Sequence, residues 1–122
     1  AKNYLFSAEQ RLAQTRQELR NIKNVSVQVF DGLTVEIEKS NGAQVIVRGL
    51  RAVSDFEYEM SMANINRQLN GGVETMIVFA RPELSHVSSR ATKEIATYGG
   101  SLEGFVSPTV AEVLKAKLKN KN

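Results

Sequence analysis

The sequence predicts an α/β domain in which helices flank a parallel β-sheet. Helix patterns and strand patterns alternate along the chain, as they do in domains with right-handed crossovers between parallel strands. Two of the strand patterns, at residues 43–47 and 75–80, are short apolar runs of the kind buried in such a sheet. The length of 122 residues suits a single domain spanning residues 1–122.

The first helix and the first strand are each marked by a local pattern. Ser7 followed by Gln10 has the form of a capping box, so we expect a helix from Ser7 to about Arg20. Residues 24–30 then alternate valines with polar residues. This alternation indicates a strand with one apolar face.

The remaining elements are bounded by residues that cap or stop helices. Ser54, Ser88 and Ser107 are expected N-caps, Pro108 suits a first helical position, and Asn41-Gly42 closes a helix. The elements are expected, in order, as a helix over 33–40, a strand over 43–47, a helix over 54–69, a strand over 75–80, a helix from 88 or 89 to 98, and a helix from 107 onward. Part of the core is expected on the third of these helices, as an apolar stripe of Met60, Met62, Ile65 and Leu69.

The order of elements predicts that part of the sheet lies outside these residues. Only three strands are visible, and a parallel sheet whose first element is a helix needs a strand before it. We therefore expect a strand that precedes the first helix to be missing from the chain as given. The domain is then N-terminally incomplete.

The composition excludes several kinds of site and partner. The chain has no Cys, which excludes disulfides, thiolate metal sites and a cysteine nucleophile, and His86 alone cannot build a multi-histidine metal site. We expect no metal held by the protein. No apolar run approaches the ~20 residues of a membrane span, and no leader pattern is present, so we expect no membrane partner and a cytoplasmic location. The net charge of +3 indicates a solvated tail and no nucleic-acid partner, because it comes from Lys115, Lys117, Lys119 and Lys121.

Side chains suited to anions follow two of the predicted strands. Arg48 and Arg51 stand three apart around Gly49, and guanidinium groups bind phosphate through fixed forks of donors. Ser88 and Ser89 open a helix after the last strand, where hydroxyls and free N–H groups can bind an anion. Ligands of open parallel sheets bind at the carboxyl ends of the strands. We therefore expect a phosphate-rich ligand there.

Each of these features also has a purely structural alternative. The two arginines could be solvated loop residues and the serines ordinary N-caps, although Arg90 beside them favours phosphate. A lone loop histidine such as His86 is more often solvated than bound to substrate. Glu57 and Glu59 point to different faces of a helix, so at most one of them serves a site. No G-x-x-x-x-G-K-[ST] or G-x-G-x-x-G fingerprint is present, and the residues alone name no reaction.

A long stretch carries a specific resemblance. The run VRGLRAVSDFEYE at residues 47–59 continues through MANINRQL at 62–69 and resumes with SHVSS at 85–89. Over essentially the whole chain the sequence resembles the bacterial phosphopantetheine adenylyltransferases. The resemblance implies a Rossmann-like domain of the nucleotidyltransferase superfamily. It also implies adenylyl transfer from ATP to 4′-phosphopantetheine, giving dephospho-coenzyme A and pyrophosphate, with Mg²⁺ as cofactor and a homohexamer as the assembly.

The resemblance further implies a role for individual residues. Arg51 would stabilise charge on the phosphates in the transition state, and Ser88 and Ser89 would donate to the β- and γ-phosphates. Residues that would bind phosphopantetheine are Lys2, Thr34 and Arg48. Residues that would bind ATP are Gly49, Leu50, Arg51, Glu59, Leu84, Ser85, His86, Val87, Ser88, Ser89 and Arg90.

Two positions depart from the family's pattern, and one motif is absent. Arg90 stands where the family commonly has a third serine, and Leu84 stands where it has an aromatic residue. The H-x-G-H motif, whose histidines stabilise the transition state in the family, does not occur in these 122 residues. The resemblance therefore implies that the first βα unit and the entry to the next strand, on the order of 30–40 residues, are missing from the chain as given. Two alternatives follow. The chain is a fragment that binds nucleotide or coenzyme A without turnover, or it is a sibling nucleotidyltransferase with another acceptor.

Overall fold

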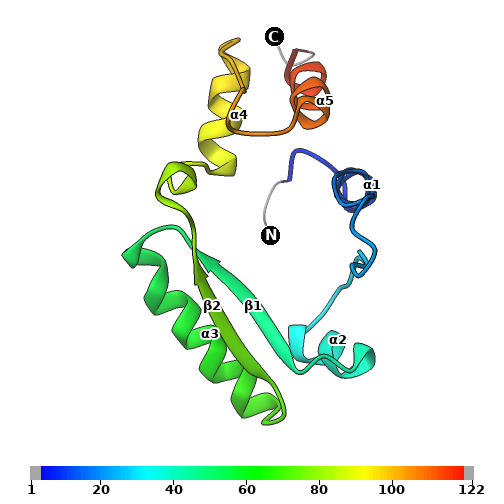
Figure 1. The fold of residues 1–122 in the computed structure, drawn as a ribbon, viewed down its shortest axis with the longest axis vertical. Coiled ribbons are helices and arrows are strands. Elements are labelled where there is room, and N and C mark those ends of the chain that lie inside the picture. The colour runs from blue at the N-terminus through cyan, green and yellow to red at the C-terminus, as the bar shows by residue number, and fades with distance from the viewer. Residues whose placement is uncertain (1–3, 120–122) are drawn as a thin grey trace. The chain divides into compact units, whose positions relative to one another are not determined.

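The computed structural model describes residues 4–119, which fold into helices and two parallel strands (Figure 1). By contact, the chain divides into two compact units, Ala1–Leu33 and Thr34–Asn122. The elements are α1 (Ala8–Glu18), α2 (Thr34–Asn41), β1 (Val45–Leu50), the 3₁₀ turn η1 (Val53–Asp55), α3 (Phe56–Leu69), β2 (Glu74–Phe79), the 3₁₀ turn η2 (Pro82–Leu84), α4 (Ser89–Thr97) and α5 (Pro108–Lys119). The assignment of residues 1–122 to one domain stays a prediction.

The first unit consists of α1 and the segment that follows it. The predicted capping box is confirmed: the Ser7 hydroxyl accepts from the Gln10 amide at 3.1 Å, and the Gln10 side chain accepts from the Ser7 amide at 2.8 Å. The strand predicted over residues 24–30 is wrong, because the sheet within residues 4–119 contains β1 and β2 alone. The carbonyl of Val27 instead accepts from Arg16 Nη2 at 3.0 Å. Alternation fits a strand, but a strand also needs a neighbouring chain to complete its hydrogen bonds.

The second unit is organised by a β–α–β arrangement. Strands β1 and β2 are connected by α3 and pair in parallel. The paired residues run from Val45 opposite Glu74 to Leu50 opposite Phe79. Each strand is six residues long. A parallel sheet with flanking helices is therefore confirmed as the fold class.

Strand β1 runs further than the sequence predicted. The expected end before Arg48 is wrong, since Arg48, Gly49 and Leu50 continue the ladder against β2. Because side chains alternate along a strand, Ile46, Arg48 and Leu50 share one side of the sheet. Leu50 is buried there, with only 2% of its surface exposed. Arg48 is thus held on a strand and not in a loop.

The face that α3 turns toward the sheet also differs from expectation. Met60, Ile65 and Leu69, expected in the core, are 45–50% exposed. The α3 residues that face the sheet have the i, i+3, i+4, i+7 spacing of one helix face, and Met62 is the member of the expected stripe that lies among them. They are Glu59, Met62, Ala63 and Asn66.

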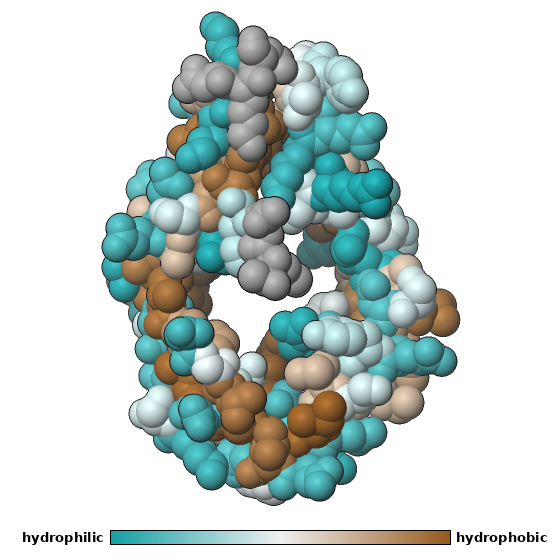
Figure 2. All heavy atoms as spheres, turned by 180° about the vertical axis from the view of Figure 1, so that it is seen from behind, coloured by the Kyte–Doolittle hydropathy of each residue, from teal (hydrophilic) through white to brown (hydrophobic). Residues whose placement is uncertain are grey.

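The opposite face of the sheet is left uncovered among the described residues. Val45, Val47, Met76 and Val78 of β1 and β2 are all about half exposed. Figure 2 shows hydrophobic side chains gathered on the surface in the lower part of the view, where α2, α3 and the sheet lie. Parallel sheets are commonly covered on both faces, so this surface is unusually apolar.

The C-terminal helices pack against each other. α4 and α5 are in contact, and the buried side chains in this region are Ala96, Leu102, Leu114 and Leu118. α5 remains helical through Lys119, so Lys115, Lys117 and Lys119 lie on a helix, while Lys121 falls outside the described residues. No helix within residues 4–119 is long and apolar enough to cross a membrane.

Candidate functional site

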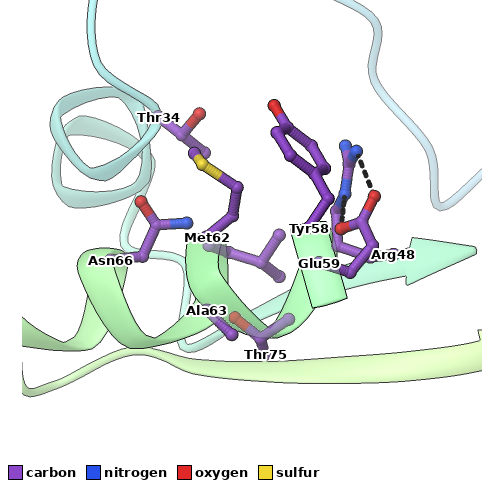
Figure 3. Close-up of a pocket in the computed structure, with 9 residues that line it drawn as sticks. Thr34, Arg48, Tyr58, Glu59, Met62, Ala63, Asn66 and Thr75 are labelled. Carbon is purple, nitrogen blue, oxygen red and sulfur yellow. Dashed lines mark hydrogen bonds and ion pairs between the residues drawn. The ribbon is translucent and has the colours of Figure 1, made fainter. Parts of the chain in front are cut away.

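A cavity of about 170 Å³ lies between α2, α3 and the α3-facing side of the sheet (Figure 3). Helix α3 supplies most of its wall, and Thr34 closes it from the start of α2. In Figure 3 the Met62 side chain extends from α3 toward Thr34. The lining residues are Thr34, Ile46, Arg48, Tyr58, Glu59, Met62, Ala63, Asn66 and Thr75. The cavity is therefore mixed in character, with an ionic end at Arg48 and Glu59 and amide, hydroxyl and apolar groups along the rest.

Arg48 and Glu59 form a two-pronged ion pair at this cavity. Arg48 Nε and Nη2 each donate to one carboxylate oxygen of Glu59, both at 2.9 Å. The Glu59 side chain is 8% exposed, whereas that of Arg48 is 52% exposed. The pair joins β1 to α3, with the carboxylate inside and the guanidinium reaching the surface.

The surroundings keep both members of the pair charged. The hydrogen bond from Arg48 lowers the pKa of Glu59 below its ordinary value; burial opposes this effect, and the positive charge of Arg48 reinforces it. The same hydrogen bond raises the pKa of Arg48. A guanidinium carries five N–H donors, and Glu59 uses two of them. Three donors remain on the exposed side of Arg48, enough to bind a phosphate group.

A second group of predicted residues meets just beyond the carboxyl end of β1. Arg51 Nη1 donates to the carbonyl oxygen of Val87 at 3.1 Å, across 36 positions of sequence. This bond joins the end of β1 to the segment 84–90 that leads into α4. Ser89 and Arg90, at the start of α4, are exposed. Arg51, just beyond the end of β1, is thus in contact with the segment that leads into the start of α4.

Several residues in this segment already have contacts within the chain. The Ser88 hydroxyl accepts from the Ala91 amide at 3.1 Å, so Ser88 is the N-cap of α4. Ser85 Oγ donates to the Pro82 carbonyl at 2.9 Å. The ring of His86 stands edge-on to that of Phe105, with the ring centres 5.6 Å apart. The Ser88 oxygen therefore acts as an ordinary N-cap, which is the structural alternative predicted for this serine. The hydroxyl hydrogen of Ser88 can still donate to a ligand.

The other residues predicted for the site differ in how exposed they are. Gly49 lies in β1 with no atom within 4 Å of where a Cβ would stand, so its backbone is open to close approach. The Leu50 side chain is buried in the core, which leaves only its backbone for a ligand. Leu84 is 46% exposed. Lys2 lies outside the described residues.

Three residues predicted for the site, Thr34, Arg48 and Glu59, line this one cavity. Glu59, which was predicted on the ATP side, is paired with Arg48, which was predicted to bind phosphopantetheine. Tyr58, Met62, Ala63, Asn66 and Thr75 were not predicted as site residues, and Met62 was assigned to the core. Counting i+3, i+4 and i+7 from Glu59 would have found the three α3 residues among them that share its face. Among residues 4–119, no three His, Cys, Asp or Glu side chains gather closely enough to hold a metal ion.

The lowered pKa of Glu59 predicts how stability depends on pH. A carboxylate whose folded pKa is depressed stabilises the fold above its unfolded pKa, and that contribution is lost as the pH falls through the folded pKa. Glu59→Gln should therefore reduce the free energy of unfolding by about 1–3 kcal/mol at pH 7, and by clearly less near pH 3. Urea unfolding at the two pH values measures the difference. Glu57→Gln, on an exposed face of the same helix, is the matched control, and an equal loss at both pH values for Glu59→Gln would contradict the role of the ion pair.

The cap at Ser88 predicts a second stability effect. Ser88→Ala should cost about 1 kcal/mol, because the Ala91 amide loses its acceptor. Ser88→Asp should restore the cap, since aspartate is an equally good N-cap. Ser89→Ala, one residue further along, should leave the unfolding midpoint unchanged. Thermal unfolding of the three variants tests this, and equal midpoints for Ser88→Ala and Ser89→Ala would show that the capping bond contributes nothing.

Known proteins resemble this chain over nearly its full length. Residues 1–95 match a family model described as cytidylyltransferase-like. A phosphopantetheine adenylyltransferase from Bdellovibrio bacteriovorus is 52% identical over 118 residues, which are 97% of this chain and 74% of that protein. Phosphopantetheine adenylyltransferases from Thermomicrobium roseum and Rhizorhabdus wittichii are 48% and 44% identical, each over 98% of this chain and over 71% and 72% of their own lengths.

These matches agree with the geometry. The family model confirms a Rossmann-type α/β fold, and the relatives cover both the Arg48–Glu59 cavity and the segment 84–90. The aligned region is nearly the whole chain, so it includes the residues of the sheet, of α3 and of the start of α4. The chain belongs to the phosphopantetheine adenylyltransferase family.

Proposed function

We propose that this protein transfers the adenylyl group of ATP to 4′-phosphopantetheine and releases dephospho-coenzyme A and pyrophosphate. The reaction class is inferred from membership of the family. The observation that carries the substrate arrangement is the pair of arginines near the carboxyl end of β1, with Arg48 on the strand at the cavity and Arg51 just beyond the strand end. At about 3.3 Å per residue their Cα atoms stand roughly 10 Å apart. That spacing suits two phosphate-bearing substrates held side by side.

Arg48 is proposed to bind the phosphate of phosphopantetheine. Its free donors face outward while Glu59 fixes the guanidinium from inside, so the donors are oriented before the ligand arrives. The cavity beside it then suits the pantetheine arm. Asn66 and Thr75 offer hydrogen-bonding groups for the amides of the arm, and Met62 and Ala63 offer apolar surface.

Arg51 and the segment 84–90 are proposed to bind ATP. Exposed Ser89 and Arg90, the open backbone at Gly49 and the N–H groups at the start of α4 are all anion-binding features. In the proposed reaction an oxygen of the pantetheine phosphate attacks the α-phosphorus in line, a new P–O bond forms, and the bond from the α-phosphorus to the bridging oxygen breaks. Pyrophosphate leaves with that electron pair. Arg51 offsets the negative charge that develops on the phosphate oxygens, and the rest of the acceleration comes from positioning.

Mg²⁺ is proposed to arrive with the nucleotide. The described residues do not fit a metal cage of their own, because Glu59 is paired with Arg48 and Asp55 accepts from backbone amides. Mg²⁺ often keeps several waters and binds substrate phosphates. The ion would therefore enter as part of the ATP complex, held by the nucleotide phosphates.

Turnover by the full-length protein tests the proposal. ATP and phosphopantetheine together should release pyrophosphate, either substrate alone should not, and EDTA should abolish the release. Arg48→Lys keeps the charge beside Glu59 but loses the fork, and should raise the KM for phosphopantetheine about tenfold or more with little change for ATP. Arg51→Lys should show the reverse pattern.

Absence of pyrophosphate release from the wild-type protein would overturn the proposed activity. Cytidine triphosphate outperforming ATP would point to a sibling nucleotidyltransferase. An unchanged KM for phosphopantetheine in Arg48→Lys would remove the role assigned to Arg48 alone.

We also propose that the protein forms a homohexamer in the cytoplasm and has no nucleic-acid or membrane partner. Ile65 and Leu69 form an exposed apolar stripe on one face of α3, and this supports self-association, because a helix in water seldom leaves such a stripe open. Light scattering of the full-length protein should give six times the monomer mass. Ile65→Glu, which places a charge in that stripe, should lower the mass, whereas Glu57→Lys should leave it unchanged. A monomeric wild-type protein would overturn this assembly.

A further inference from the structure

Asp55 makes an unusual set of backbone contacts immediately after β1. Its Oδ2 atom accepts from the amides of Arg51 and Ala52, both at 3.3 Å. Its own amide donates to the Ala52 carbonyl at 3.1 Å. Together these bonds close a tight turn between the end of the strand and the start of α3. The direction in which the chain leaves β1 is therefore set by one carboxylate.

One of these bonds caps η1, because Asp55 is the third residue of that turn and accepts from the amide of its N-cap residue, Ala52. Asp55 directly precedes α3, at the position where an aspartate normally accepts from the free amides of the following helix turn. Its side chain makes no such capping bond to α3. It turns back toward Arg51 and Ala52 instead.

The residue whose amide Asp55 holds is the one that reaches the segment 84–90. Arg51 Nη1 donates to the Val87 carbonyl at 3.1 Å, which uses one of the five donors of its guanidinium. Four donors remain for an anion. Fixing the Arg51 amide fixes the direction of its Cα–Cβ bond, and a long side chain amplifies any error in that direction at its far end. We propose that Asp55 is a positioning residue for the nucleotide, acting through Arg51.

The negative charge of Asp55 provides a way to test this role. A carboxylate close to a polyphosphate site repels the ligand, so its presence there needs an offsetting gain. Two neutral amides satisfy the carboxylate oxygen without cancelling its charge. Asparagine can accept from the same amides through one oxygen and carries no charge. The Asp55→Asn variant therefore separates the hydrogen-bonding role from the charge.

The inference rests on the proposed function, and steady-state kinetics of the full-length protein tests it. Asp55→Ala should lower kcat/KM for ATP about tenfold and leave the KM for phosphopantetheine within about twofold. Asp55→Asn should stay within about threefold of the wild type for ATP. Glu57→Ala, which removes the same charge two residues later on an exposed face, should change neither value.

A double-mutant cycle tests whether Asp55 acts through Arg51. In an Arg51→Ala background, Asp55→Ala should lower kcat/KM for ATP by no more than about twofold further, because the side chain that it positions is already gone. An undiminished tenfold effect in that background would overturn the inference. So would equal losses for both substrates, or a lower unfolding midpoint with unchanged kinetics in Asp55→Ala.

Calorimetry with ATP keeps this inference separate from the proposed reaction. Should the wild-type protein release no pyrophosphate, the proposed activity fails. The affinity of wild-type protein, Asp55→Ala and Asp55→Asn for ATP still decides the role of Asp55. Weaker binding by Asp55→Ala, restored by Asp55→Asn, supports positioning, and equal affinities contradict it.

Discussion

The parallel pairing of β1 with β2 is the constraint on which the rest of the structure depends. Parallel strands joined by a helix bring their carboxyl ends to the same edge of the sheet, so the residues that follow them become neighbours. This is why Arg51 reaches the carbonyl of Val87, 36 positions away. The same pairing extends β1 to Leu50 and orients Arg48 toward α3. Both arginines owe their positions to a ladder of six residues in each strand.

The Arg48–Glu59 pair adds a second link, between the sheet and α3. A carboxylate as deeply buried as that of Glu59 costs several kcal/mol unless a partner compensates it, and two bonds of 2.9 Å supply that partner. The pair also joins a residue proposed to bind phosphopantetheine to one that the family resemblance connects with ATP. Removing Arg48 would therefore also leave the buried carboxylate of Glu59 without its partner.

Helix caps, which depend on a few neighbouring residues, were predicted correctly, whereas two features that depend on distant contacts were not. The capping patterns at Ser7 and Ser88 need only a few neighbouring residues, and both are confirmed by the bonds that the hydroxyls accept. The strand predicted over 24–30 needs a partner that the pattern alone does not supply. Met60, Ile65 and Leu69 were expected in the core because apolar stripes usually face inward, but the α3 face that meets the sheet is the one bearing Glu59.

By itself the sequence determined the fold class and the family, because periodicity, caps and a long specific motif are all contained in contiguous residues. Only the tertiary structure decided which residues wall the cavity, since Met62, Asn66 and Thr75 come together through packing of α3 on the sheet. It also decided that Asp55 turns back to the Arg51 amide and that Arg51 binds the Val87 carbonyl. Such contacts depend on the angle at which separate elements meet, and no local pattern encodes that angle.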